Sequence, residues 1–337
     1  MRILKYLYLA VGIALLVAVI SQVDVAEVAT QVARIGPLGL IVILSIHFVA
    51  FALDTVAWQL TLVRVPLNMR WAYRTWRLRM VSEVFNTVLP AAGMGGEPMK
   101  AELLKKHYGI GYREGLSSII LAKTTILLAL VLFLIIGFAL MWRNDSLDGA
   151  LKLVAAAGLA VFSLSIALFF MVQRWRGASL AGTWLARFRF ARRLEAALHH
   201  IHDIDERLVD FYTRHTGRFA SAYALAFVAW VLGAAEVYYA MAFLGHPVTL
   251  AEAWIIGAAA ELVSHGTFFI PASIGAQEGA FLIVCAAITG SPSLGVAMAV
   301  VRRFREVLWL LWGGLLGLLL VRRPITADGD ADKPAGE

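Results

Sequence analysis

The chain has 337 residues, of which 60% are hydrophobic and only 16% are charged, whereas soluble domains are about 45–50% apolar and about 25% charged. Its mean hydropathy is +0.76, and apolar runs recur along most of its length, so we expect an all-α integral membrane protein without a separate soluble catalytic domain. Cys285 is the single cysteine, which excludes an intramolecular disulfide, and it lies in an apolar segment, which argues against a redox function. The net charge of +7 is concentrated between apolar runs, a pattern typical of membrane topology and anionic lipid rather than nucleic acid.

Six apolar stretches are long enough to cross a hydrocarbon core of about 30 Å as helices. They cover residues 3–21, 37–62, 116–142, 151–172, 219–244 and about 294–321. The first is interpreted as a signal anchor, because its apolar run is long and no clear small-residue cleavage site follows it.

Basic residues predict the orientation of these spans. Residues 64–113 and 174–218 each contain nine lysines and arginines, whereas the alternate loops contain only Arg34 and Arg143. Because basic loops stay in the cytoplasm, we expect both chain ends there, together with a cytoplasmic loop over residues 173–218. The membrane domain then covers residues 1–323, and the polar tail over 324–337 is predicted to be disordered.

Two regions do not fit a simple count of spans. Residues 71–110 begin with several arginines and continue into an apolar sequence, and residues 251–292 are apolar but interrupted by Pro271, Gly275 and Gly279. Each half, at about 15 residues, is too short to cross the membrane. We therefore predict two re-entrant helical hairpins, one from each face. Such non-helical backbone is stable at membrane depth only when it is buried in protein or lines a wet cavity, so a central cavity is expected.

The two predicted turns resemble each other. Residues 89–97 read LPAAGMGGE and residues 270–278 read IPASIGAQE, so that Glu97 and Glu278 each fall seven positions after a proline. A spanning helix with cationic residues follows each turn, which indicates an inverted repeat of the kind that forms the substrate site of many transporters. The predicted turn residues are Asn86, Pro90, Gly93, Gly95, Gly96, Pro271, Gly275, Gln277 and Gly279.

The predicted site combines these turns with nearby charges. Proline and glycine leave unpaired N–H groups and a new helix N-terminus, which attract anions, while a carboxylate at membrane depth requires a partner or a function. Three arginines outnumber the one acid near them in sequence, Glu306, and this favours contact with a lipid headgroup. The predicted substrate-binding residues are Glu97, Lys123, Glu278, Arg302, Arg303, Arg305 and Glu306, supported by Arg79, Glu83 and Lys100.

Several alternatives remain open for individual residues. Glu97 and Glu278 are also suited to capping the helix that follows each turn, and Arg79 and Glu83 are spaced to pair with each other on one helix. His47 with Asp54, and Glu261 with His265, have the spacing of proton paths or of polar packing between helices. The histidines over residues 199–202 fit no standard metal site, so no metal or cofactor is expected.

Two longer stretches resemble a known family. Residues 79–104, RMVSEVFNTVLPAAGMGGEPMKAELL, and residues 269–312, with IPASIGAQEGAFL and AVVRRFREVLWLLW, are similar to the membrane region of the lysylphosphatidylglycerol synthases, a flippase-like family. The GGE turn and the RRFRE helix look most like the branch associated with hopanoid biosynthesis. The resemblance implies a bacterial inner-membrane protein that binds or moves a phospholipid, isoprenoid or hopanoid lipid. Because this chain lacks the aminoacyl-transfer domain of two-part members, lysine transfer is not expected.

The leading hypothesis is thus a lipid translocase that is not an enzyme. Because the sequence has no G-x-x-x-x-G-K-[ST] motif for ATP, movement is expected to be downhill or coupled to an ion gradient. One alternative is a membrane transferase that uses Glu97 or Glu278 as a base. Another is a scaffold that assembles lipid-synthesis enzymes through its basic loops without transporting lipid.

Overall fold

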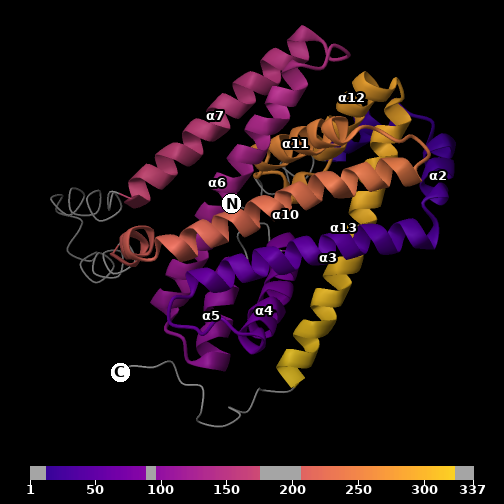
Figure 1. Ribbon diagram of the computed structural model, residues 1–337. Coiled ribbons are helices and arrows are strands. Elements are labelled where there is room, and N and C mark those ends of the chain that lie inside the picture. The colour runs from indigo at the N-terminus through magenta and orange to yellow at the C-terminus, as the bar shows by residue number, and fades with distance from the viewer. Residues whose placement is uncertain (1–12, 89–95, 175–205, 323–337) are drawn as a thin grey trace, which may run out of the picture.

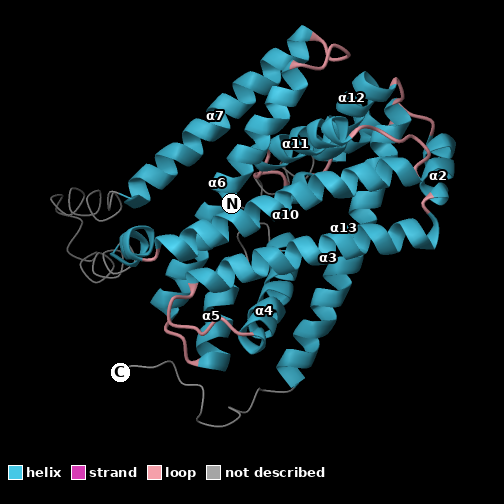
Figure 2. Ribbon diagram, in the orientation of Figure 1, coloured by secondary structure: helices cyan, strands magenta, loops and turns pink. Residues whose placement is uncertain are grey.

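The computed structural model describes residues 13–88, 96–174 and 206–322, and in those ranges all regular structure is helical (Figures 1 and 2). This confirms the prediction of an all-α membrane protein. The helices are α2 (Val25–Arg34), α3 (Gly36–Thr61), α4 (Met69–Val88), α5 (Glu97–Tyr108), α6 (Tyr112–Trp142), α7 (Gly149–Arg174), α10 (Thr216–Phe243), α11 (Leu250–Gly266), the 3₁₀ turn η2 (Pro271–Ser273), α12 (Ala276–Thr289) and α13 (Pro292–Arg322). Short helices also cover Ile13–Ile20 and residues 206–214.

Four of the described helices are long and apolar enough to cross a membrane, namely α3, α6, α7 and α10. They coincide with four of the six predicted spans. For the first predicted span, the described part is Ile13–Ile20, which bends by 89° into α2; residues 1–12 lie outside the described ranges.

The sixth predicted span lies in α13, a continuous helix of 31 residues. At 1.5 Å per residue this helix is about 46 Å long, which exceeds the hydrocarbon core. It is not among the four apolar helices, because Arg302, Arg303, Arg305 and Glu306 occupy its middle. The charges of the predicted site are therefore carried by a helix that needs protein neighbours on several sides.

The first predicted hairpin consists of α4 and α5, which pack against each other. The ring of Trp71, near the start of α4, lies 5.2 Å from that of Tyr108 at the end of α5, so the two helices run antiparallel. Asn86 lies in the last turns of α4, and Gly96 directly precedes α5. The predicted turn residues Pro90, Gly93 and Gly95 lie outside the described ranges.

The second predicted hairpin consists of α11 and α12, with η2 between them. The chain reverses through left-handed backbone at Ala272 (φ 51°), Ser273 (φ 49°) and Gly275 (φ 82°). Because α12 restarts at Ala276, Gln277 and Gly279 lie inside this helix. The prediction that they belong to the turn is wrong, as it is for Asn86 in the first hairpin.

Small residues set the close approaches between helices. α3 and α10 lie side by side over most of their length (Figure 1), and α13 crosses α12 at Gly295, whose missing side chain leaves room for the backbone of Phe281 and Leu282. Membrane helices associate through such contacts, because lipid provides no hydrophobic drive between them. These packings bring both hairpins and the middle of α13 to one place.

Candidate functional site

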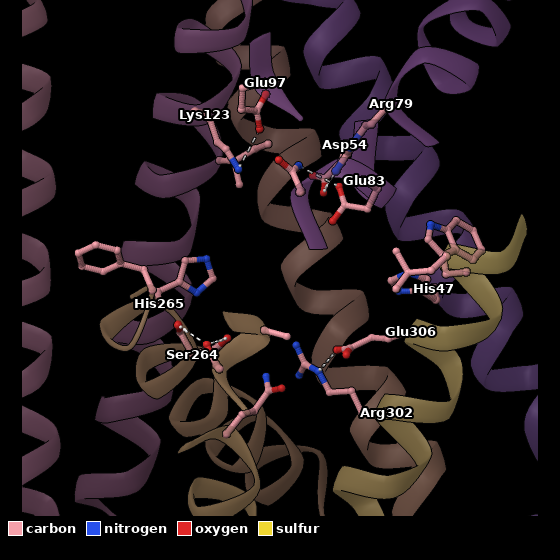
Figure 3. Close-up of a pocket in the computed structure, with 18 of the residues that line it drawn as sticks. His47, Asp54, Arg79, Glu83, Glu97, Lys123, Ser264, His265, Arg302 and Glu306 are labelled. Carbon is pink, nitrogen blue, oxygen red and sulfur yellow. Dashed lines mark hydrogen bonds and ion pairs between the residues drawn. The ribbon is translucent and has the colours of Figure 1, made fainter. Parts of the chain in front are cut away.

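A cavity of about 530 Å³ lies where the two hairpins meet the long helices. Its walls come from both hairpins and from α3, α6, α10 and α13. A smaller cavity of about 210 Å³ shares part of this wall. Figure 3 shows residues at the sides of the larger cavity, called the central cavity below, with Glu97 and Lys123 opposite Arg302 and Glu306, and His265 opposite His47.

At the first hairpin, the buried Glu97 carboxylate opens α5 and binds two lysines. Its Oε2 lies 2.9 Å from Lys100 Nζ on the next turn, and its Oε1 lies 3.3 Å from Lys123 Nζ on α6. The hairpin holds Glu97 in place because Asn86 Oδ1 accepts a hydrogen bond from the Gly96 N–H at 2.8 Å. The side chain of Lys123 is 44% exposed, so it retains room for a ligand.

At the second hairpin, Glu278 performs the capping role that the sequence left open. Its Oε2 accepts a hydrogen bond from the Gly275 N–H at 2.7 Å, which satisfies a donor at the start of α12. Its Oε1 accepts a second hydrogen bond from Arg303 Nε at 2.6 Å. The same carboxylate therefore starts a helix and fixes it to α13.

Arg303 also holds the strained turn of this hairpin. Its Nη2 donates to the carbonyl of Ala272 at 2.9 Å, and the Ser273 hydroxyl donates to the Ser264 carbonyl at 3.0 Å. Left-handed backbone costs about 1–3 kcal/mol at each non-glycine residue, so these bonds stabilise a conformation that the chain would otherwise avoid.

The two hairpins thus place their charges in the same way. In each, a buried carboxylate at the start of the returning helix binds a cation on the helix that follows: Glu97 binds Lys123 of α6, and Glu278 binds Arg303 of α13. The sequence match between the turns therefore extends to matching ion pairs.

The arginines of α13 have more partners than the sequence indicated. Arg302 Nη2 donates to Glu261 of α11, and Arg305 Nη1 donates to Glu236 of α10. Glu306 lies 2.8 Å from Arg303 Nη1 and 3.6 Å from Arg302 Nε. Four carboxylates therefore face three arginines, and the expectation of surplus positive charge here is wrong, because Glu236 and Glu261 come from distant parts of the chain.

The same balance extends over the whole cavity. Cations and carboxylates both line the walls, and the arginines of α13 bind three further carboxylates that do not line this cavity. The cations are Arg79, Lys100, Lys123, Arg302, Arg303 and Arg305, and the carboxylates are Asp54, Glu83, Glu97, Glu236, Glu261, Glu278 and Glu306.

Arg79 has a different partner from the predicted one. Its Nη2 lies 3.1 Å from Asp54 Oδ2 on α3, so the sequence-local pairing with Glu83 is wrong and the contact instead joins α4 to α3. Glu83 lines the cavity, where its Oε2 lies 3.5 Å from Asn86 Nδ2. The Arg79 guanidinium also lies 4.3 Å from the ring centre of Phe51.

Both histidines contact carboxylates that hold arginines. His265 Nδ1 lies 3.5 Å from Glu261 Oε2, as the spacing of four residues allowed. His47 Nδ1 lies 3.8 Å from Glu236 Oε2 rather than beside Asp54. The first contact lies within α11, and the second joins α3 to α10. Glu236 was not among the predicted site residues because its partner Arg305 lies 69 positions later.

One side chain of the cavity wall offers an unused donor. Gln277 is 3% exposed, and its Nε2 has no hydrogen-bond partner among the residues that the structure describes. A buried polar group without a partner costs about 1–3 kcal/mol, so Gln277 is suited to bind a ligand acceptor. In the same ranges, no three histidine, cysteine or acidic side chains are grouped to hold a metal ion.

Comparison with known proteins agrees with this architecture. The family model described as lysylphosphatidylglycerol synthase TM region matches residues 6–314. A UPF0104 membrane protein from Methanothermobacter thermautotrophicus is 23% identical over 310 residues, which cover 88% of this chain and 89% of that protein. No solved structure matches the chain.

Proposed function

Because the chain belongs to the family of the lysylphosphatidylglycerol synthase transmembrane region, we propose that it is a lipid translocase. A polar headgroup of a phospholipid, isoprenoid or hopanoid lipid enters the central cavity while the hydrocarbon chains remain in the membrane. We also propose that the chain belongs to the branch of this family that is associated with hopanoid biosynthesis. We further propose a bacterial inner membrane, with both chain ends in the cytoplasm, from the distribution of basic residues.

The observation that carries the proposal is the meeting of both hairpins at one charged cavity inside a bundle of apolar helices. Each charge at membrane depth costs about 2.5–3.5 kcal/mol on insertion scales. So many charges around a cavity are more than packing requires, whereas a headgroup that must pass through hydrocarbon needs such partners. The re-entrant, inverted arrangement of the hairpins is part of the proposal, since it gives the cavity access from both faces.

The balanced charge of the wall suits transport rather than storage. Each arginine of α13 already has a carboxylate partner, so a headgroup phosphate exchanges with a carboxylate instead of filling a strongly positive trap. Conduction requires a site that binds well enough to admit its substrate and weakly enough to release it. Gln277 Nε2 and the half-exposed Lys123 supply the donors that the headgroup meets first.

The proposal is tested with purified protein in liposomes that contain fluorescent NBD-phosphatidylglycerol, by dithionite quenching of the outer leaflet. Wild-type protein is expected to make the inner-leaflet probe accessible faster than empty liposomes do. Gln277→Met removes the free donor without breaking a described hydrogen bond, so folding is preserved while exchange slows about tenfold, the effect of one hydrogen bond to a charged group. Gln31→Met, at a buried glutamine outside the cavity whose Nε2 donates to Glu27 Oε1 at 3.0 Å, is the control for the loss of a buried amide elsewhere in the protein.

Two further variants remove charges of the cavity. Glu278→Ala and Arg305→Ala are expected to abolish exchange, with the amount of folded protein checked by gel filtration. Wild-type rates of lipid exchange in Gln277→Met, Glu278→Ala and Arg305→Ala would show that the central cavity is not the translocation site. If wild-type protein gives no exchange above empty liposomes and the purified protein forms a lipid product from added donors, the protein is a transferase and the translocase proposal is wrong.

A further inference from the structure

A second large cavity, of about 770 Å³, lies at the end of the bundle where α3 ends and α6 and α10 begin. None of its lining residues lines the central cavity. They are Val63, Arg64, Val65, Pro66, Trp71, Gly109, Ile110, Gly111, Tyr112, Arg113, Glu114, Arg207 and Arg218.

The lining of this cavity has a surplus of positive charge. Four arginines from four separate segments meet here, with Glu114 as the one acid among the lining residues. Arg64 follows α3, Arg113 and Arg218 lie in the first turns of α6 and α10, and Arg207 lies in the helix before α10. The central cavity, in contrast, matches its cations with carboxylates.

Two of these arginines, Arg218 and Arg64, are held by neutral groups or by a distant carboxylate. Arg218 Nη1 donates to the carbonyls of Leu62 at 3.2 Å and Leu60 at 3.5 Å, at the end of α3, which fixes the guanidinium without neutralising it. Arg64, with a 57% exposed side chain, lies 3.9 Å from Glu114, the outer limit of an ion pair. An exposed pair at this distance contributes about 0–1 kcal/mol, so it yields readily to a stronger anion.

Backbone and indole donors add to the arginines. The chain turns between α5 and α6 through Gly109, at φ 69°, and Gly111 is an N-cap without a side chain. The first N–H groups of α6 therefore lack a side-chain cap, and a helix N-terminus of this kind favours an anion. Trp71 also lines the cavity, and its buried Nε1 has no hydrogen-bond partner among the described residues.

We propose that this cavity binds a phosphate-bearing anion, either the headgroup of a phospholipid in the adjacent leaflet or a soluble phosphate ester. Guanidinium groups, a helix N-terminus and an indole N–H are the donors that phosphate oxygens accept. The apolar part of the wall, Val63, Val65 and Pro66, provides contact for the glycerol part of either ligand. The site is separate from the translocation site and does not depend on it.

The test uses the full chain in dodecyl maltoside with added dioleoyl-phosphatidylglycerol, and native mass spectrometry counts the bound lipid. The double variant Arg64→Gln/Arg207→Gln is expected to lower affinity about thirtyfold, because each basic residue near an anionic lipid contributes about fivefold. The control Lys105→Gln/Arg214→Gln removes the same charge from exposed residues at the same end that do not line the cavity. It is expected to retain binding within about twofold, because neither residue lines the cavity and exposed charges contribute little.

Two further measurements identify the source of the phosphate. Competition by millimolar glycerol 3-phosphate or inorganic phosphate supports a soluble ligand at this site, and displacement by lipid alone supports the headgroup. Equal losses of lipid affinity in both double variants would mean that general surface charge explains the binding, and this would overturn the proposal. Wild-type affinity in Arg64→Gln/Arg207→Gln would overturn it as well. Because binding rather than leaflet exchange is scored, a failure here leaves the proposed translocase untouched.

Discussion

The Glu278 carboxylate lies 2.6 Å from Arg303 Nε and accepts the Gly275 N–H at 2.7 Å, so one side chain begins α12 and fixes it to α13. The contact ties the turn of the second hairpin to the helix that carries three of the cavity's six cations. Its counterpart, between Glu97 and Lys123, ties the first hairpin to α6. The rigidity of the cavity therefore depends on these carboxylates.

Replacing Glu278 by Gln is expected to destabilise the protein by about 2 kcal/mol, because the hydrogen bonds lost are to a charged group. Arg303 retains Glu306, which limits the loss. Thermal unfolding in detergent measures the effect. The matched control is Glu252→Gln. Glu252 is the third residue of α11, as Glu278 is of α12, and its carboxylate accepts a hydrogen bond from the Thr249 N–H. An equal shift for both variants would mean that capping alone explains the role of Glu278.

The pair of Arg305 and Glu236 is expected to show strong coupling in a double-mutant cycle. Both side chains are buried, so Arg305→Met alone or Glu236→Gln alone leaves a charge without its partner, at a cost of about 3–5 kcal/mol. The double variant leaves neither charge and should be more stable than the sum of the single losses predicts. Denaturant unfolding of the four proteins gives the coupling energy, and additive losses would contradict the assigned pair.

The two lysines that bind Glu97 are expected to differ. Lys100 is buried, and its Nζ also lies 5.5 Å from the ring centre of Trp58, so Lys100→Met should cost about 2 kcal/mol of stability. Lys123 is 44% exposed, and Lys123→Met should cost less than about 1 kcal/mol while slowing lipid exchange. Melting temperatures and exchange rates of both variants check this division; a stability loss at Lys123 that exceeds the one at Lys100 would reverse it.

Two glycines of α13 provide a test of the close packing against α12. A Cβ at Gly295 would lie 2.6 Å from Leu282 Cα, also in conflict with the Phe281 carbonyl, whereas a Cβ at Gly314 meets nothing within 4 Å. Gly295→Ala is therefore expected to destabilise by about 1–3 kcal/mol through overpacking. Gly314→Ala should be neutral or stabilising by up to about 1 kcal/mol. Similar melting temperatures for the two variants would show that α12 and α13 are not in such close contact.

Local signals predicted much of the helical structure. Four apolar stretches became α3, α6, α7 and α10, because about 20 apolar residues satisfy their own backbone in a helix. The interruption at Pro271 and Gly275 correctly indicated a break, since both residues favour non-helical backbone. The exact limits of the turn were missed at Gln277 and Gly279, because capping by Glu278 allows α12 to begin at Ala276.

The amino-acid sequence by itself determined the class of protein, its apolar helices, the two broken segments and the carboxylates that follow them, because these depend on local composition and spacing. Only the tertiary structure decided which charges meet. Arg79 binds Asp54 rather than Glu83, and Arg305 binds Glu236, since a buried charge pairs with whichever opposite charge the helix packing brings within reach. The charge balance of the central cavity follows from contacts between distant segments, and these cannot be read from neighbours along the chain.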